Sequence, residues 1–300
     1  LYKLMPDNFT GGPVHFLNLR ESNQYKNGQK LTCKNLISGG ASLSKDLEEE
    51  LNKVSDGYAE EGVVNNDIIV RQGYGLTENI AMGTYSMRGA YKFGSIGIPM
   101  PYCIIGIFTP GTDEELKYYE EGEICITGPT VMMGYLNNEE ETNQVIKVHS
   151  DGRRWIHTKD IGYMDETGHI FFKDRLKNIF MRTGFNVHPS TISNTINSLP
   201  YVVDSVTIGF NDPIEQCVPV SFVVLNEEML KDKDEEELRK EIIDYCYANL
   251  EETSVPVEIV FTNMLPINLG GKVDTNRIAK ESEINLYKSS KIKKRIKFNV

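Results

Sequence analysis

The chain has 300 residues, 40% hydrophobic and 25% charged, which are ordinary values for a globular protein large enough for two domains. Its formal net charge of −11 excludes general nucleic-acid binding, which needs a basic surface, so no nucleic-acid partner is expected. Five scattered cysteines without a CxxC pair argue against a disulfide framework or a zinc site and predict a reducing, cytoplasmic location. No apolar run is long enough to span a bilayer, so no integral membrane segment is expected.

The first part of the chain predicts strands that end in glycine-rich turns. Residues 35–38 are expected to end a strand, followed by the small residues 39–41 and by a helix that Ser44 caps. Residues 67–71 predict a second short strand, which leads into QGYGLTE at 72–78. Open α/β sheets bind ligands at the carboxyl ends of their strands, so both turns are candidates for a site. Taken alone, residues 39–41 are better explained as a tight strand-to-helix turn.

QGYGLTE has residue types suited to a nucleotide. Its two glycines bracket Tyr74, so the backbone can approach a ligand closely while the ring offers a stacking face. Thr77 supplies a hydroxyl for a phosphate oxygen, and Glu78 a hard oxygen ligand for magnesium. The alternative, weighed evenly on these seven residues, is a glycine-rich turn whose Thr-Glu pair only begins a helix.

The middle of the chain predicts β-structure. Residues 94–134 contain short apolar strands broken by glycine and proline, which predict a small β-barrel or a distorted sheet. Residues 155–177 predict two hairpin-like strands that carry Asp160 and Arg175 to one edge. A carboxylate can accept from two ribose hydroxyls, and a guanidinium can bind oxygens beside it. The simpler alternative for Asp160 is a turn acid at the end of a strand.

After Lys177 the pattern changes to a small α+β domain. The predicted strands are 178–182, 201–209, 218–225 and 257–261, and the predicted helices are 189–198 and 234–250. We therefore predict two domains. Residues 1–176 would form an α/β sheet followed by the small β-barrel, and residues 177–300 would form a separate α+β domain of ordinary size.

Two further segments complete the set of motifs. Residues 122–135 read GEICITGPTVMMGY, whose Met pair is expected to be core. Residues 265–274 read LPINLGGKVD, a loop that ends in Lys272 and can offer a mobile positive charge. An exposed lysine on a hairpin is the simpler alternative for Lys272. With QGYGLTE, Asp160 and Arg175, these segments resemble, in the same order, the motifs of the adenylate-forming superfamily of acyl-CoA synthetases, luciferases and peptide-synthetase adenylation domains.

The resemblance implies specific roles. Tyr74 stacks on adenine, Thr77 contacts the α-phosphate, Glu78 holds Mg²⁺ and Asp160 binds the ribose, while Lys272 bridges the carboxylate and the α-phosphate. The implied catalytic residues are Lys272, Thr77 and Glu78. The implied nucleotide site comprises Gly39, Gly40, Ala41, Gln72, Gly73, Tyr74, Gly75, Thr77, Asp160, Phe172 and Arg175. The implied hinge is Lys177, and the implied loop for the acceptor thiol contains Gly184 and Phe185.

The implied reaction is the ATP-dependent ligation of a small-molecule carboxylic acid to a thiol, through an acyl-adenylate. Its cofactors are ATP or AMP, Mg²⁺ and coenzyme A. Leu76 favours an acyl- or aryl-CoA ligase, such as one of fatty acid metabolism, because amino-acid-activating members usually have proline there. The alternatives are an enzyme that loads a carrier-protein pantetheine and a non-catalytic nucleotide-binding relic.

Three departures from the superfamily pattern qualify these expectations. Lys159 replaces the usual glycine before Asp160, and Met181 and Thr183 replace frequent lysines near the acceptor loop. The Ser/Thr/Gly-rich phosphate loop that lies upstream of QGYGLTE in the family does not occur in the sequence. We therefore expect the C-terminal part of a longer ligase that adenylates poorly or not at all by itself; a chain that never had the loop is the other interpretation.

Overall fold

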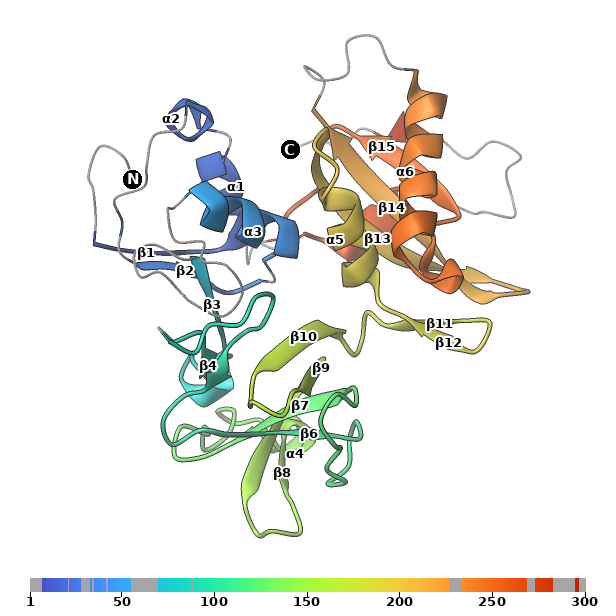
Figure 1. The fold of residues 1–300 in the computed structure, drawn as a ribbon. Coiled ribbons are helices and arrows are strands. Elements are labelled where there is room, and N and C mark those ends of the chain that lie inside the picture. The colour runs from blue at the N-terminus through green and yellow to red at the C-terminus, as the bar shows by residue number, and fades with distance from the viewer. Residues whose placement is uncertain are drawn as a thin grey trace. The chain divides into compact units, whose positions relative to one another are not determined.

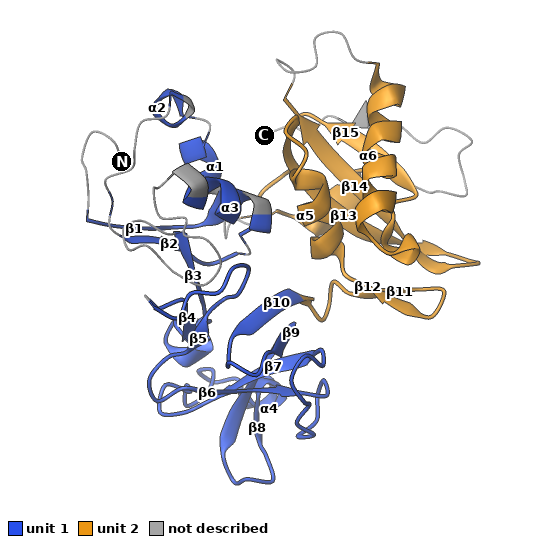
Figure 2. Cartoon of the chain, viewed as in Figure 1, with its two compact units in different colours: residues 1–173 blue, residues 174–300 orange. Residues whose placement is uncertain are grey.

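The chain, whose elements Figure 1 labels, divides into two units, residues 1–173 and 174–300, which Figure 2 draws in blue and orange. The division lies close to the predicted boundary after residue 176, and the hinge role of Lys177 stays a prediction. The computed structural model describes residues 7–20, 22–27, 33, 35–41, 43–54, 70–87, 89–226, 234–268, 273–282 and 295–296.

The first unit begins with an α/β sheet. Its strands are β1 (Asn8–Gly11), β2 (Asn35–Ser38), β3 (Val70–Tyr74), β4 (Thr84–Tyr85) and β5 (Ile98–Pro99), in that order. The first three strands are parallel, and β4 and β5 continue the sheet antiparallel. The helices are α1 (Pro13–Arg20), α2 (Asn23–Lys26) and α3 (Lys45–Val54).

Apolar residues of the helices and the parallel strands form one buried core. Phe16 of α1 and Leu47 and Leu51 of α3 pack with Leu36 of β2 and Val70 of β3. Leu47 and Leu51 are four residues apart, so they lie on one face of α3. This spacing explains why the segment folds as a helix against the sheet.

The N-terminus of α3 confirms the predicted cap. Ser44 Oγ accepts a hydrogen bond of 3.3 Å from the backbone N–H of Leu47. The helix continues to Val54.

A second sheet follows in the same unit, and the predicted β-barrel is wrong. The strands are β6 (Ile104–Phe108), β7 (Gly122–Thr127), β8 (Ile146–Val148), β9 (Arg154–Met164) and β10 (Ile170–Arg175), with helix α4 (Glu139–Val145) before β8. Among the described residues the order is β10-β9-β7-β6, with β8 added to β9, so the sheet is open. The alternative prediction, a distorted sheet, agrees with this order.

Strand β7 is buried on both of its faces. Ile124 and Ile126 belong to an apolar cluster that includes Ile170, whereas Cys125 packs with Phe108 and Trp155 in another cluster. Successive residues of a strand point to opposite faces, so both faces of β7 are covered. The sheet therefore buries its apolar residues without closing on itself.

The second unit confirms the predicted α+β pattern. Its main sheet contains β13 (Val202–Asp212), β14 (Gln216–Leu225), β15 (Glu258–Thr262) and β16 (Arg295–Ile296), and its hairpin contains β11 (Phe180–Arg182) and β12 (Phe185–Val187). The helices are α5 (Pro189–Asn197), α6 (Glu235–Asn249) and α7 (Thr275–Glu281). Ile259 and Phe261 pack on the side of α5 and α6, and Val260 packs with Ile278 of α7. No helix of the described residues is long and apolar enough to cross a membrane.

Candidate functional site

The two glycine-rich turns lie beside each other at the carboxyl ends of β2 and β3. Gly39 directly follows β2, and its N–H donates to Gly11 O at 3.1 Å. A Cβ at Gly39 would lie 3.4 Å from Gly73 O in the neighbouring strand, so the two backbones are close. Gly40 has a φ of +83°, a conformation that glycine adopts readily, and Ala41 is exposed in the same turn.

The QGYGLTE segment folds back on its own chain. Gly83 N donates to Tyr74 O at 2.8 Å, and Ala81 N donates to Leu76 O at 2.9 Å. A Cβ at Gly75 would lie 2.1 Å from Ala81 O, which no side chain could tolerate. The chain itself therefore makes a close approach that requires this glycine, and the expected approach of a ligand stays a prediction.

Tyr74 and Asp160, which are 86 residues apart, are joined by a hydrogen bond. The Tyr74 hydroxyl donates to Asp160 Oδ2 at 2.7 Å, and Asp160 is only 3% exposed. Tyr74 and Phe172 both pack against the apolar cluster on β7. The structure thus brings together the residues predicted for adenine and ribose. Arg175, exposed at the end of β10, belongs to the second unit, and its role stays a prediction.

Glu78 lies in the single-turn helix η1 (Thr77–Asn79) and is held by the loop that follows β7. The Tyr135 hydroxyl donates to Glu78 Oε1 at 2.6 Å, and Met132 N donates to Glu78 O at 2.8 Å. The hydrogen bond to this carboxylate raises the pKa of Tyr135 to about 12. The Thr77 side chain is exposed beside it.

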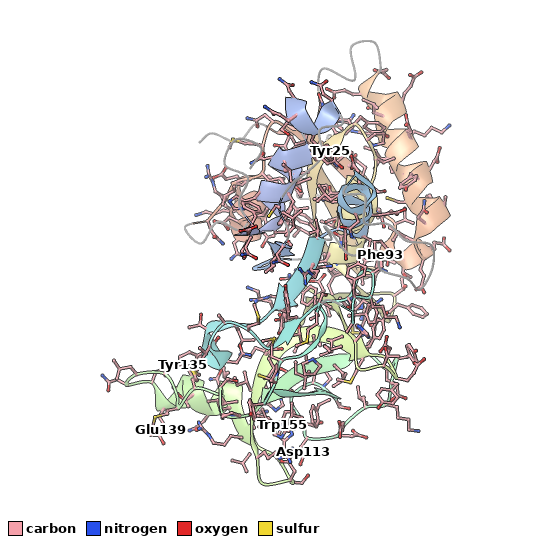
Figure 3. The ribbon with its side chains drawn as sticks, turned by 60° about the vertical axis from the view of Figure 1, so that its left-hand side comes forward. Tyr25, Phe93, Asp113, Tyr135, Glu139 and Trp155 are labelled. Atoms are coloured by element: carbon pink, nitrogen blue, oxygen red, sulfur yellow. The ribbon has the colours of Figure 1, made fainter. Side chains whose placement is uncertain are left out.

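Sequence reasoning missed the role of Tyr135. The tyrosine closes the GEICITGPTVMMGY motif, which gave a signal for the family but none for a contact with Glu78. Figure 3 labels Tyr135 in the first unit. The expectation for the Met pair holds in part, because Met132 packs against the core whereas Met133 is 92% exposed.

The segment Thr158-Lys159-Asp160 forms a bulge in β9. Glu123 of β7 pairs with Ile161 and Cys125 with His157, so two steps along β7 oppose four along β9. Lys159 has a φ of +59°, the left-handed region that glycine occupies readily, which explains why glycine suits this position. Lys159 therefore departs from the superfamily pattern in residue type while adopting a glycine-like backbone conformation.

Three hydrogen bonds hold the bulge. Thr158 Oγ1 donates to Ile124 O at 2.6 Å and accepts from Asp160 N at 3.1 Å. Lys159 N donates to Glu123 Oε1 at 2.8 Å.

A buried cluster that residue spacing did not predict lies behind the bulge. Glu123, Cys125 and His157 place one oxygen, one sulfur and one nitrogen within 4.8 Å of one another. These atom types suit zinc. Glu123 Oε2, however, is 2.8 Å from His157 Nδ1 and accepts from Gly111 N at 3.0 Å. Burial raises the pKa of the Cys125 thiol, which disfavours the thiolate a metal needs. The cluster is therefore explained by hydrogen bonding.

A second buried glutamate lies behind QGYGLTE. Gln72 Nε2 donates to Glu48 Oε2 at 2.8 Å, so the Gln72 side chain is turned toward α3. Tyr91 OH donates to Glu48 Oε1 at 2.7 Å, and Gly94 N is 3.3 Å from Oε2. Burial, only partly offset by these donors, raises the pKa of Glu48 to about 7. Any ligand contact of Gln72 would have to come from its backbone.

The remaining predicted residues belong to the second unit. Lys177 is exposed in the turn after β10. Gly184, with a φ of +87°, and Thr183, with a φ of +49°, form the two-residue turn of the β11–β12 hairpin, and Phe185 is 62% exposed. Lys272 lies outside the described residues.

Comparisons with known proteins show which family shares this fold and these motifs. Residues 3–136 match the family model of the AMP-binding enzymes, and residues 191–272 match that of the AMP-binding enzyme C-terminal domain. Probable 4-coumarate–CoA ligase 2 of Dictyostelium discoideum is 36% identical over 219 residues, 73% of this chain and 36% of that protein. The long-chain-fatty-acid–CoA ligase of Bacillus subtilis (strain 168) is 30% identical over 284 residues, 94% of this chain and 47% of that protein. The chain thus spans less than half the length of these curated relatives.

Solved structures give the same result. ATP-bound MatB from Rhodopseudomonas palustris has 26% identity and a TM-score of 0.76, over 94% of this chain and 52% of that chain. MenE from Bacillus subtilis, in complex with the acyl-adenylate OSB-AMP, has 25% identity and a TM-score of 0.74, over 92% of this chain and 51% of that chain. Both matches are to models of the AMP-binding enzymes, which is therefore the class of protein that shares this fold. Within that class the chain belongs to the adenylate-forming superfamily, acyl-CoA synthetase type, as its motifs predicted.

The backbone at Lys159 gives a stability prediction. A left-handed conformation costs a residue with a side chain about 1–2 kcal/mol, and glycine removes this cost. Glycine also makes the unfolded chain more flexible, which offsets part of the stabilisation. Lys159→Gly should therefore stabilise the first unit by up to about 1 kcal/mol. Urea unfolding followed by the fluorescence of Trp155, the single tryptophan, measures this change. The control Lys147→Gly, in strand β8, should destabilise instead; a similar loss at both positions would contradict the argument.

The buried Glu48 gives a pH prediction. The pKa of Glu48 rises from 4.5 in the unfolded chain to about 7 in the fold. The stabilisation that Glu48 gives to the fold is therefore complete below pH 4.5 and is lost as the pH rises through 7. The difference between these two pKa values corresponds to roughly 3 kcal/mol in the free energy of unfolding. Glu48→Gln should remove this part of the pH dependence between pH 5 and 8, as measured by urea unfolding followed by circular dichroism. Glu50→Gln, at an exposed position of the same helix, should keep the wild-type curve, and an unchanged slope in Glu48→Gln would refute the assignment.

Proposed function

We propose that the protein acts as an ATP-dependent ligase that joins a carboxylic acid to the thiol of coenzyme A. In the first step the carboxylate attacks the α-phosphorus of ATP, which forms an acyl-adenylate and releases pyrophosphate. In the second step the thiol attacks the acyl carbon and AMP leaves. The observation that carries the proposal is the 2.7 Å hydrogen bond between Tyr74 and Asp160, because it joins the two residues assigned to adenine and ribose.

The nucleotide part of the proposal is supported by the chemistry of these two side chains. The Tyr74 ring offers a face for adenine, and its hydroxyl orients the Asp160 carboxylate. A carboxylate has about four positions that accept hydrogen bonds, so Asp160 can accept from the tyrosine and from ribose hydroxyls together. Phe172 packs against the same apolar cluster as Tyr74.

Magnesium is the metal that the proposal includes, and Glu78 fits it. A carboxylate oxygen is the ligand that Mg²⁺ prefers, used with substrate phosphates and water. Tyr135 donates to Oε1, and among the described residues no other side chain donates to this carboxylate. When bound, the ion neutralises charge on the phosphates. Tyr135 orients Glu78, and the exposed Thr77 hydroxyl is available to an α-phosphate oxygen.

The second unit supplies the remaining proposed roles. We assign Lys272 to the charge that develops between the carboxylate and the α-phosphate, Lys177 to the hinge, and the hairpin with Gly184 and Phe185 to the thiol path. Coenzyme A is favoured as the acceptor by Leu76 and by the names of the two curated relatives, which are both CoA ligases. Those names, 4-coumarate and long-chain fatty acid, make aromatic and long-chain acids the first substrates to test.

Carboxylate-dependent exchange of pyrophosphate into ATP tests the first step. The whole protein, as its organism produces it, should catalyse exchange with at least one acid, and its Lys272→Ala variant should be slower by roughly 10²–10³ with AMP binding nearly intact. Lys280→Ala, exposed in α7, is the matched control and should keep the wild-type rate. No exchange with any acid, together with AMP binding, would favour a nucleotide-binding relic; an unchanged Lys272→Ala rate would remove that lysine from the mechanism. Thioester formation with coenzyme A or a carrier protein then identifies the acceptor.

Tyr135 gives a prediction about magnesium. Tyr135→Phe removes the hydrogen bond to Glu78 Oε1, so the carboxylate loses its orientation. Loss of such a supporting contact weakens metal binding by roughly tenfold or more, and we expect half-maximal exchange to need that much more Mg²⁺. Tyr102→Phe, at a residue that is 84% exposed, should leave the Mg²⁺ dependence unchanged. A slower Tyr135→Phe enzyme with wild-type Mg²⁺ dependence would exclude this role.

A further inference from the structure

Glu123 is a buried acid to which the proposed reaction gives no role, yet it contacts the bulge that carries Asp160. It is 2% exposed. Its Oε1 accepts from Lys159 N at 2.8 Å, and its Oε2 accepts from Gly111 N at 3.0 Å. The first of these bonds reaches the residue immediately before Asp160, and that residue has the unfavourable left-handed backbone.

His157 also contacts Glu123, and His149 contacts His157 in turn. His157 Nδ1 lies 2.8 Å from Glu123 Oε2, and His157 Nε2 lies 2.9 Å from His149 Nε2. His149 in turn stacks on Trp155, with ring centroids 5.3 Å apart and the planes inclined by 17°. Figure 3 labels Trp155 in this part of the first unit. The imidazole and indole rings therefore fix the carboxylate in one orientation.

The negative charge of Glu123 strengthens its hydrogen bond with the backbone N–H of Lys159. Burial would raise the pKa of its carboxyl group, but the hydrogen bonds from His157, Gly111 and Lys159 outweigh burial and lower it. The carboxylate thus stays ionised, and an ionised acceptor binds a backbone N–H more strongly than a neutral one.

We propose that Glu123 is a positioning residue for nucleotide binding: it holds the bulge at residues 158–160 so that the Asp160 carboxylate faces the ribose hydroxyls. This role rests on the proposed function. It predicts that loss of Glu123 weakens the recognition of the ribose, while contacts to the base and the phosphate are kept. Such a selective effect separates positioning from a general loss of stability.

The experiment compares the affinity for AMP with that for its 2′,3′-dideoxy analogue, using the whole protein. Wild type should prefer AMP. In Glu123→Ala this preference should fall by roughly tenfold, the value of one hydrogen bond to a charged group, while the affinity for the dideoxy analogue stays near wild type. Glu123→Gln, which keeps the shape and one acceptor oxygen, should show a smaller loss and serves if the alanine variant does not fold.

A matched control and a direct measurement of the bulge complete the test. Cys125→Ala removes a buried neighbour whose Sγ lies 3.6 Å from His157 Nδ1, and it should keep the AMP preference. Hydrogen exchange at the Lys159 amide should accelerate in Glu123→Ala but not in Cys125→Ala.

The outcomes distinguish a failure of the positioning role of Glu123 from a failure of the proposed function. If wild type prefers AMP and Glu123→Ala or Glu123→Gln keeps that preference, or if both ligands weaken equally, the positioning role is overturned and the proposed function stands. If wild type does not bind AMP, the proposed function fails and the positioning role fails with it.

Discussion

A buried carboxylate supports each of the two motifs that form the candidate nucleotide site, and the geometry of the site depends on these two acids. Glu48 accepts from the side chain of Gln72, behind QGYGLTE. Glu123 accepts from the backbone of Lys159, behind the bulge. A buried side-chain amide and a backbone N–H in a bulge both need an acceptor of this kind.

Glu48 and Glu123 both accept hydrogen bonds from these motifs, but their pKa values shift in opposite directions. Burial dominates at Glu48, whose donors are a tyrosine hydroxyl, an amide and a backbone N–H, and its pKa is raised to about 7. At Glu123, His157 and two backbone N–H groups outweigh burial and lower the pKa. Glu48, behind the α/β sheet, therefore titrates near neutral pH, whereas Glu123, behind the bulge, stays ionised.

The sequence allowed most elements and the superfamily to be predicted, because both follow from local patterns. Neighbouring residues determine the helix cap at Ser44 and the two glycine-rich turns that follow strands. They also determine the alternation of strands and helices in the second unit. The barrel was wrong because apolar spacing shows that a strand is buried but gives no information about which strands pair. The contacts of Tyr135 with Glu78 and of Glu123 with His157 were missed for a related reason: they join residues 57 and 34 positions apart, and spacing carries no signal for such pairs.

The lysine at position 159 shows how a motif can lose its most recognisable residue and keep its geometry. The left-handed backbone costs about 1–2 kcal/mol for a residue with a side chain, and a hydrogen bond to a charged group is worth about 1.5–3 kcal/mol. The bond to Glu123 can therefore offset the absence of glycine, so the partner strand, rather than the residue in the bulge, determines its shape. A search pattern that requires glycine before this aspartate would pass over such chains, whereas one that pairs the aspartate with the glutamate of the neighbouring strand would retain them.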